Sequence, residues 1–423
     1  MTAERKTSSL VLQGGRPLRG SVDIGGSKNA TLGAMAACLL APEVSVLTNV
    51  PRISDIEYMA AILRSLGASV EWDGPDTLRI DAAGVNTPRP ERAAAERIRG
   101  SFLIMGALLS RLGEAACPPP GGDVIGLRPV DVHLKGFAAL GAEIVESAEW
   151  FEVRGPELRG ADIFNDYPSV LGTQNLMMAA ATASGTTTIF NAAAEPEVQG
   201  LAEMLRGMGA KVRGEGTSTI VIDGVDALHG TEYRIIPDRL EAGTFAIAAA
   251  ITGGDVEVRG ALPGHVTSLI HKLREAGVSV ETGSESLRVR ATGSLRGVTI
   301  QSLPYPGFAT DLQAPMAALL TQADGLSRVM ERVFDNRLLY VGELTKMGAN
   351  IDTLDSTTAI INGPTPLRGA RVKALDVRAG AAVILAGLAA EGETEISDIY
   401  HIDRGYQAID ERLRSLGAHI ERV

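Results

Sequence analysis

Leu66-Gly67-Ala68-Ser69-Val70-Glu71-Trp72 contains the clearest signal of the fold, because its first three residues recur along the chain with conservative changes. The tripeptide ends a segment with helical periodicity, and the alternating apolar and polar run behind it is typical of a strand. Its recurrences are Leu140-Gly141-Ala142, Met208-Gly209-Ala210, Ala276-Gly277-Val278, Met347-Gly348-Ala349 and Leu416-Gly417-Ala418. Their spacing of roughly 70 residues predicts one structural unit that is used six times.

A second series of polar residues keeps the same period in a different phase. Its members stand just before small-residue, apolar runs of helical length: Lys28, Arg99, Ser169, Arg239, Asp311 and Arg378. The runs behind them, such as 31–41 and 381–390, are apolar on all sides, which is typical of helices surrounded by protein. We therefore expect an α/β protein with helices inside and sheets outside. Because helix N-termini attract anions and four of these six starts carry a cation, we expect a small anionic ligand.

The length of 423 residues suits two domains of about 200 residues each, so the six units divide three and three. Each unit reads as strand, helix, strand, helix, strand. The first unit is predicted to contain a strand at 21–24, a helix capped by Ser27, a strand at 44–49, a helix at 55–66 and a strand at 69–72. These units predict two inside-out α/β domains, each of three βαβαββ-like repeats.

The joint between the two halves is predicted near residues 233–237. The fourth unit lacks an obvious partner for its opening strand, so we expect the N-terminal strand, residues 8–13, to cross to the second half. The predicted domains are therefore 28–236 and, discontinuously, 1–27 plus 237–423. A ligand shared by two such domains is expected in the cleft between them, where helix starts face one another.

Composition excludes several classes of function. The net charge of −11 and an aromatic content of 4% argue against a nucleic-acid partner. The two cysteines, Cys38 and Cys117, cannot form a disulfide framework, and no Cys/His cluster has zinc spacing, so neither a metal nor a redox cofactor is expected. The N-terminus has no apolar signal region and no apolar run is long enough to span a bilayer, so we expect a cytoplasmic protein without a membrane partner.

A set of short motifs in a fixed order carries a resemblance to a known family. The motifs are Gly25-Gly-Ser-Lys-Asn29, Arg97-Ile98-Arg99-Gly100-Ser101, Pro120-Gly-Gly-Asp-Val-Ile-Gly-Leu-Arg-Pro-Val-Asp-Val-His133, Glu195-Pro-Glu197, Pro237-Asp-Arg239, Thr310-Asp-Leu-Gln313, Val333-Phe334 with Asn336-Arg337, Asp376-Val-Arg378 and His401-Ile-Asp-Arg-Gly-Tyr406. Together they resemble the UDP-N-acetylglucosamine 1-carboxyvinyltransferases, the enolpyruvyl transferases of peptidoglycan synthesis. The resemblance runs from about residue 10 to residue 423, and it implies the enolpyruvyl transferase fold of two inside-out domains.

The resemblance implies phosphoenolpyruvate and UDP-N-acetylglucosamine as substrates, with no cofactor and a monomer or weak homo-oligomer. It assigns Lys28, Arg128 and Arg404 to the phosphate and carboxylate of phosphoenolpyruvate, which suits a small, highly charged substrate. The positions that match contacts to the UDP-sugar are Asn29, Arg99, Asp131, Val132, His133, Ser169, Asp311 and Val333. Pro129 and Arg378 are further expected substrate-binding residues. Asp311, beside the 3′-hydroxyl of the sugar, is the favoured general base.

The main departure from the family is in the loop 118–128, which we expect to be mobile. Most of the family has a cysteine where this chain has Asp123, and Cys117 lies six residues upstream of it. A carboxylic acid at 123 could donate the proton to C3 of phosphoenolpyruvate. Because fosfomycin alkylates the cysteine in the family, the resemblance implies a fosfomycin-insensitive enzyme. Three further departures are Leu171, Ala194 and Gly200, near the expected sugar site.

Other interpretations stay open at this point. Asp311 could cap a helix at 312–320, Asp376 and Arg378 could form a structural ion pair, and Asp123 could be a turn residue after Gly122. The chain could use another acceptor, such as shikimate 3-phosphate or an unusual nucleotide sugar. It could also be a catalytically silent paralogue that binds the nucleotide sugar.

Overall fold

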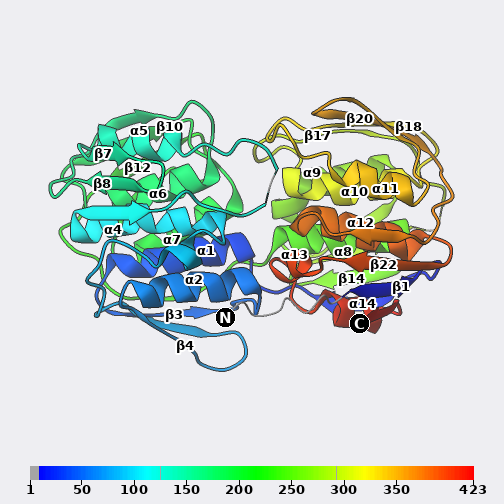
Figure 1. Ribbon diagram of the computed structural model, residues 1–423, viewed down its shortest axis with the longest axis horizontal. Helices are drawn as coiled ribbons and strands as arrows, with labels where there is room; N and C mark the ends of the chain where they lie inside the picture. Colours follow the sequence, from blue (N-terminus) through cyan, green and yellow to red (C-terminus); the bar gives the residue numbers. More distant parts are fainter. Residues whose placement is uncertain (1–8, 124, 292) are drawn as a thin grey trace. The chain divides into compact units, whose positions relative to one another are not determined.

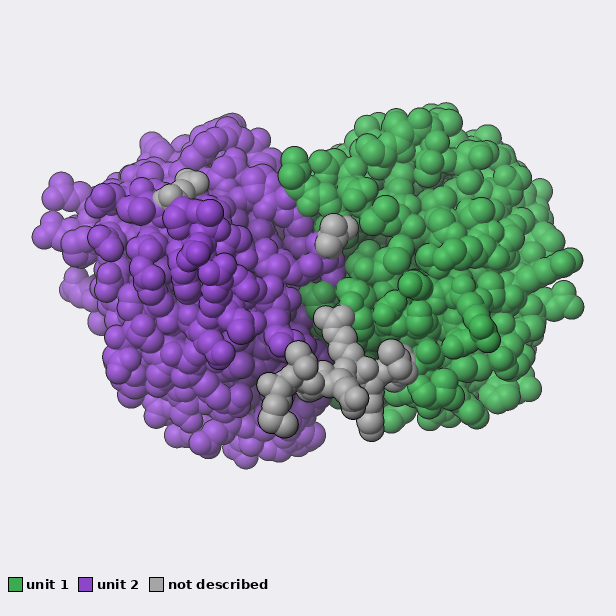
Figure 2. Space-filling view, in the orientation of Figure 1, with its two compact units in different colours: residues 1–25, 124–127, 237–423 green, residues 26–123, 128–236 purple. Residues whose placement is uncertain are grey.

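The computed structural model describes residues 9–123, 125–291 and 293–423 (Figure 1). Contacts between Cα atoms divide the chain into two units (Figure 2). Unit 1 contains residues 1–25, 124–127 and 237–423, and unit 2 contains residues 26–123 and 128–236. The chain therefore crosses from one unit to the other several times, and each unit has a hydrophobic core of its own.

Unit 2 has seven helices and three small sheets among its described residues. Its helices are α1 (Lys28–Ala37), α2 (Ser54–Ser65), α3 (Arg92–Ala95), α4 (Ile104–Leu112), α5 (Asp131–Ala139), α6 (Val170–Ala180) and α7 (Pro196–Gly207), with 3-10 turns η1 (Cys38–Leu40) and η2 (Arg99–Leu103). Its strands are β3 (Val44–Thr48), β4 (Ser69–Trp72), β5 (Leu78–Asp81), β6 (Glu114–Cys117), β7 (Glu143–Glu146), β8 (Phe151–Arg154), β9 (Asp162–Phe164), β10 (Thr186–Phe190), β11 (Lys211–Arg213), β12 (Thr219–Asp223) and β13 (Glu232–Arg234). The strand orders are β13-β3-β5-β4, β6-β8-β7 and β11-β12-β10-β9.

Unit 1 repeats this plan with three four-stranded sheets in its described part. Its helices are α8 (Arg239–Ile251), α9 (Thr267–Glu275), α10 (Gln313–Leu320), α11 (Tyr340–Lys346), α12 (Val377–Ala389), α13 (Tyr400–Asp403) and α14 (Ile409–Ser415), with 3-10 turns η3 (Pro263–Val266) and η4 (Thr310–Leu312). Its strands are β1 (Leu10–Gln13), β2 (Arg19–Asp23), β14 (Asp255–Arg259), β15 (Ser279–Thr282), β16 (Ser286–Arg290), β17 (Thr299–Gln301), β18 (Gly325–Met330), β19 (Ile351–Asp355), β20 (Thr358–Gly363), β21 (Arg371–Lys373), β22 (Glu393–Ser397) and β23 (His419–Arg422). The strand orders are β15-β16-β14-β2, β17-β18-β20-β19 and β21-β22-β1-β23.

The recurring Gly-Ala signature ends one helix in every repeat. Its six glycines, Gly67, Gly141, Gly209, Gly277, Gly348 and Gly417, all have positive φ angles, between 93° and 105°. In the first repeat the amide of Gly67 donates to the Arg64 carbonyl and the amide of Ala68 donates to the Leu63 carbonyl. This is the Schellman pattern, which needs a left-handed residue and therefore favours glycine. The signature predicted the helix ends correctly because its glycine meets a backbone requirement.

The helices that follow the polar starts are buried, as the sequence predicted. Every residue of α8 after Arg239 is buried, and the same holds for α12 from Val377 to Leu388. The strands outside them bury only alternate residues, as in β14, so one face of each sheet covers the helices and the other meets solvent. The predicted order of helices inside and sheets outside is confirmed.

One expected strand is present with a different partner, and another is missing from the described residues. The strand predicted at 21–24 as the opening of the first repeat is β2, but it pairs in parallel with β14, and β13 takes the place beside β3. The second repeat has no opening strand in the described residues; there, the carbonyl of Pro88 accepts one bond, from the Ala116 amide. Pro88 and Pro90 have no N–H group, so this segment cannot complete a ladder.

The N-terminal strand lies between strands from the far end of the chain. β1 is antiparallel to both β22 and β23, with Leu10 opposite Ile396 on one side and Arg422 on the other. Residue 8, the first of the expected strand, lies outside the described residues. β1 occupies the place in its sheet that β5 has beside β3 and β4, so it completes the sixth repeat.

Candidate functional site

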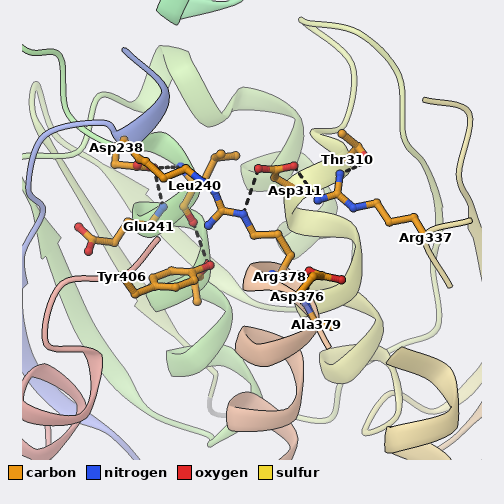
Figure 3. A network of polar contacts seen from close by, with 12 residues as sticks. Asp238, Leu240, Glu241, Thr310, Asp311, Arg337, Asp376, Arg378, Ala379 and Tyr406 are labelled. Atoms are coloured by element: carbon orange, nitrogen blue, oxygen red, sulfur yellow. Dashed lines mark hydrogen bonds and ion pairs between the residues drawn. The ribbon is translucent and has the colours of Figure 1, made fainter. Parts of the chain in front are cut away.

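Asp311 is the centre of a polar network in unit 1 (Figure 3). Its Oδ1 accepts from Arg337 Nη2 at 2.8 Å and its Oδ2 accepts from Arg378 Nε at 3.0 Å. The interpretation of Asp311 as a helix cap is wrong, because Ala309 is the cap of η4, Leu312 is the cap of α10, and neither start has a side-chain cap bond. The carboxylate is 23% exposed, so a ligand can still reach it.

The two guanidinium groups around Asp311 are both buried. Burial alone would lower the pKa of Arg337, but Asp311, Asp376 and Glu331 raise it above its ordinary value. Burial opposes the charge of Arg378 in the same way, and Tyr406, Asp311 and Asp238 more than offset it, so its pKa is also raised. Both cations therefore stay charged, and a carboxylate held between them is fixed in one orientation.

Acidic caps hold the helices on either side of this network. The carboxylate of Asp376 accepts from the amides of Arg378, at 2.7 Å, and Ala379, at 2.9 Å, at the start of α12. Asp238 caps α8 in the same way. Asp376 therefore stabilises the backbone that presents Arg378, while the Arg378 side chain is turned to Asp311. Three helix starts of unit 1, those of α8, α10 and α12, contribute to one cluster (Figure 3).

Val333 and Arg404 also belong to unit 1. The amide of Val333 donates to Glu331 Oε1 at 2.7 Å, and its side chain is 38% exposed. Arg404 is the C-cap of the short helix α13 and is partly buried. Arg239, the expected cation of the α8 start, lies over the ring of Tyr305 with 5.9 Å between Cζ and the ring centroid.

Lys28 and Asn29 open helix α1 of unit 2. Ser27 is the N-cap, as predicted, and its hydroxyl accepts from the Ala30 amide at 3.3 Å. Lys28 Nζ donates to Asp55 Oδ2 at 3.2 Å, and the Asp55 side chain is buried in the first turn of α2. The lysine charge is therefore held at the start of α1 by a carboxylate that the sequence analysis did not single out.

Arg99 and Arg128 bring two positive charges close together in unit 2. Arg99 Nη2 donates to the carbonyl oxygens of Arg128 and, at 3.0 Å, of Pro129. Burial and the neighbouring charge of Arg128 lower the pKa of Arg99 to about 10. The two neighbouring guanidinium groups repel each other, and an anion bound between them would relieve that repulsion. A Cβ on Gly122 would lie 3.6 Å from Arg128 Nη1, so the residue before Asp123 lies beside these cations.

Asp131, Val132 and His133 form the first turn of α5. Its N-cap, Val130, makes no side-chain cap bond, so the first amide groups of the helix point outward as donors. The neighbouring helix α6 begins behind Ser169, whose hydroxyl accepts from the Gly172 amide at 3.1 Å. A Cβ on Gly172 would lie 2.7 Å from Val132 Cγ1. The structure therefore brings the predicted residues Val132 and Ser169 together.

The imidazole of His133 points into the core. It is 2% exposed, Asn175 Nδ2 lies 2.8 Å from its Nδ1, and Phe102 contacts it edge to face. An amide nitrogen only donates, so Nδ1 accepts and the ring is neutral. Burial, followed by the charge of Arg99, lowers the pKa of His133 to about 3. A ligand contact at residue 133 would therefore use its backbone rather than its ring.

We expect acid to destabilise unit 2 through His133. The pKa is about 3 in the folded protein and that of an unfolded histidine is about 6.5, so the unfolded chain binds more protons between these values and stability falls as pH falls. Between pH 7.5 and pH 5.5, the unfolding free energy should drop about 1.4 kcal/mol more for wild type than for His133→Gln. Chemical denaturation at both pH values tests this, with exposed His229→Gln as the control. Equal pH dependence in wild type and His133→Gln would contradict it.

Neither Cys38 nor Cys117 has the solvent access that a nucleophilic cysteine needs. Cys38 and Cys117 are fully buried, and burial raises the pKa of each thiol to about 12. Cys117 ends strand β6 with its Sγ 3.9 Å from Ser101 Oγ. A reactive cysteine needs an accessible thiolate, so both residues are structural.

Comparison with known proteins identifies the chain. Residues 12–413 match the family EPSP synthase (3-phosphoshikimate 1-carboxyvinyltransferase). The UDP-N-acetylglucosamine 1-carboxyvinyltransferase 3 of Caldanaerobacter subterraneus subsp. tengcongensis is 50% identical over 414 residues, which cover 98% of this chain and 99% of that protein. The UDP-N-acetylglucosamine 1-carboxyvinyltransferase of Finegoldia magna is 50% identical over 409 residues, 96% of each chain. This chain belongs to the UDP-N-acetylglucosamine 1-carboxyvinyltransferase family.

Solved structures agree with this family in fold. The enolpyruvyl transferase NikO from Streptomyces tendae superposes with a TM-score of 0.89 at 26% identity, covering 99% of both chains. The EPSP synthase from Acinetobacter baumannii superposes with a TM-score of 0.73 at 21% identity, covering 99% of this chain and 100% of that one, and indicates the fold alone. The predicted enolpyruvyl transferase fold is confirmed.

The sequence of this UDP-N-acetylglucosamine 1-carboxyvinyltransferase family member did not reveal every residue of the polar networks described above. Arg337 was quoted in a motif without a role, and Asp55, Glu331 and Asn175 were not singled out at all. Their common signal is a charged or amide side chain that the structure buries, which one sequence cannot reveal. Gly200, one of the three positions where this chain departs from the family near the expected sugar site, packs against Tyr233. A Cβ on Gly200 would lie 2.8 Å from the Tyr233 hydroxyl, so a side chain at 200 would displace that ring.

Metal-binding clusters and membrane-spanning helices are both missing from the described residues. Among them, no group of three or more His, Cys, Asp or Glu side chains could hold a metal ion. Within the same residues, no helix is both long and apolar enough to cross a membrane.

Proposed function

We propose that this chain transfers the enolpyruvyl group of phosphoenolpyruvate to the 3′-hydroxyl of UDP-N-acetylglucosamine and releases phosphate. The observation that carries this proposal is Asp311, a reachable carboxylate whose two oxygens are held by Arg337 and Arg378. Family membership over nearly the whole chain supports it. The product enters peptidoglycan synthesis at its first committed step, and the reaction needs no cofactor.

Asp311 is proposed as the general base. Its two oxygens accept from Arg337 and Arg378, its side chain is 23% exposed, and an ionised carboxylate can take up the proton of a hydroxyl. In the proposed reaction the sugar oxygen loses its proton and bonds to C2 of phosphoenolpyruvate, while C3 receives a proton. The resulting tetrahedral intermediate then loses a proton from C3 and expels phosphate from C2, which forms the enolpyruvyl ether.

Cations are proposed to hold phosphoenolpyruvate. Lys28, Arg128 and Arg404 bind its phosphate and carboxylate in this proposal, and they share the negative charge of the substrate. The pairing of Lys28 with Asp55 supports the assignment, because that carboxylate keeps the ammonium group at the start of α1.

Helix starts and two arginines are proposed to hold the UDP-sugar. The proposed contacts are Asn29, Arg99, Asp131, Val132, His133, Ser169, Asp311 and Val333, and Pro129 and Arg378 are proposed as further substrate-binding residues. The outward amides of α5 and the adjacent charges of Arg99 and Arg128 support a diphosphate at this place in unit 2. For His133 the proposal is limited to its backbone.

Asp123 is proposed to stand where most of the family has cysteine and to donate the proton to C3. Residue 124 of the expected mobile loop 118–128 lies outside the described residues, and mobility is proposed for the rest of the loop. The enzyme is proposed to be insensitive to fosfomycin. We further propose domains at 28–236 and at 1–27 plus 237–423, a monomer or weak homo-oligomer, and a cytoplasmic location. The nearness of Gly122 to Arg99 and Arg128 supports a role for the neighbouring carboxyl at the anionic substrate.

Phosphate release by the purified protein tests the proposed function. Release should require both phosphoenolpyruvate and UDP-N-acetylglucosamine, and shikimate 3-phosphate should not replace the sugar nucleotide. In Asp123→Asn, release should fall about 100-fold if the carboxyl is the proton donor. Binding of UDP-N-acetylglucosamine without phosphate release would instead favour a silent paralogue, and full activity of Asp123→Asn would move the proton donor elsewhere.

A further inference from the structure

Glu331 is a buried carboxylate at the end of β18 that no proposed role has used. It is fully buried, and its own amide donates to the Thr357 carbonyl at 2.7 Å, just before β20. Its Oε1 accepts from the amides of Val333, at 2.7 Å, and Phe334, at 3.3 Å. The carboxylate therefore closes the turn 331–334 that presents Val333.

The other oxygen of Glu331 faces Thr310, the residue before Asp311. The Thr310 hydroxyl lies 2.7 Å from Glu331 Oε2 and 2.7 Å from Arg337 Nη1. An ionised carboxylate only accepts and a guanidinium only donates, so the hydroxyl donates to Glu331 and accepts from Arg337. The direction of every hydrogen bond in this chain of contacts is thus determined by its chemistry.

Arg337 links Thr310 to the carboxylate of Asp311. With Nη1 on Thr310, its Nη2 is directed at Asp311 Oδ1 at 2.8 Å, and the planar guanidinium fixes both bonds together. Five successive hydrogen-bonded groups therefore join the turn at Val333 to the orientation of Asp311.

We propose that Glu331 and Thr310 are positioning residues that orient Asp311 through Arg337 and tie that orientation to the turn carrying Val333. This inference rests on the proposed function, in which Asp311 is the base and Val333 touches the sugar nucleotide. Contact of the acceptor with the turn then favours the arrangement in which the base is ready to accept its proton.

Removing the Thr310 oxygen should release Arg337 from Asp311. In Thr310→Val, Glu331 Oε2 loses its donor and Arg337 Nη1 loses its acceptor, so the guanidinium turns toward Glu331. Asp311 then keeps its ion pair with Arg378 but loses that with Arg337. Around these two arginines lie Glu331, Asp376, Asp238 and Tyr406. With less positive charge beside it, Asp311 takes up a proton at higher pH.

The test compares Thr310→Val with Thr310→Ser, which keeps the hydroxyl. Thr310→Val should lower kcat about 10- to 100-fold while the KM for phosphoenolpyruvate changes less than about threefold. The acidic limb of its kcat–pH profile should move to higher pH. Thr310→Ser should recover most of the wild-type kcat and the wild-type limb, and Thr345→Val, which removes an exposed helical hydroxyl, should resemble wild type.

Two results would overturn the proposal. The first is a Thr310→Val enzyme with wild-type kcat and pH profile. The second is a lower kcat that follows only a lower melting temperature, with the acidic limb unmoved, because that pattern indicates a structural role. Asp311→Asn separates this inference from the proposed function: if Asp311→Asn stays active, the assignment of the base fails, and if only Thr310→Val is unaffected, the positioning role alone fails.

Discussion

Replacing Asp311 by asparagine should lower kcat for phosphate release by about 100- to 10,000-fold, the usual contribution of a general base. The asparagine keeps the shape of the side chain but cannot accept the proton of the 3′-hydroxyl. It also removes the negative charge between Arg337 and Arg378, so the folded protein should lose some stability. Steady-state phosphate release, measured below the melting temperature of the variant, checks the prediction.

The controls for Asp311→Asn separate chemistry from folding. Asp355→Asn changes an exposed carboxylate at the end of β19 that bonds only to nearby threonines in the contacts described, and it should leave kcat near that of wild type. Calorimetry should show that Asp311→Asn still binds UDP-N-acetylglucosamine, because Arg99, Arg128 and the start of α5 are unchanged. An Asp311→Asn enzyme within tenfold of wild-type kcat would require another base.

Wild type should resist covalent modification by fosfomycin, whereas the Asp123→Cys enzyme should be inactivated with time. The native thiols are buried with pKa values of about 12, so wild type offers the epoxide no reactive thiolate. A cysteine at 123 follows a glycine that lies beside Arg99 and Arg128, and nearby cations favour the thiolate form. Intact-protein mass spectrometry and residual activity check the prediction.

Asp123→Asn and Asp123→Ser are matched controls for this experiment. Neither provides a thiol, so neither should gain mass or lose activity with time in fosfomycin. Peptide mapping should place the adduct of Asp123→Cys at residue 123 and leave Cys38 and Cys117 unmodified. A covalent adduct at 123 in wild type, or an Asp123→Cys protein that stays unmodified, would contradict the prediction.

The repeat of the fold was predictable because it rests on local backbone chemistry. A helix that ends in a left-handed residue favours glycine at that position, and all six signature glycines have positive φ angles. The spacing of these glycines in the sequence therefore matches the spacing of the helix ends in the structure. All-round apolar runs predicted buried helices for the same kind of reason, since burial on every side needs an apolar residue at every position.

The partners of strands and of buried polar groups were not predictable in this way. The pattern at 21–24 indicated a strand, but nothing local distinguishes β14 from β3 as its neighbour. Asp311 has the residue type and position of a helix cap, and only the fold brings Arg337 and Arg378 to its two oxygens. His133 matched a ligand-contacting position, yet its ring is held inside by Asn175 and Phe102. These choices depend on contacts between residues far apart in sequence.

The position of β1 has a consequence for how the chain folds during synthesis. β1 is made first, yet both of its neighbours, β22 and β23, are made last. Its sheet therefore closes a loop of nearly the whole chain, the kind of non-local pairing that slows folding. All of unit 2, residues 26–123 and 128–236, is synthesised before residues 237–423 of unit 1. We therefore expect unit 2 to fold on the ribosome, whereas β1 can pair only at the end of translation.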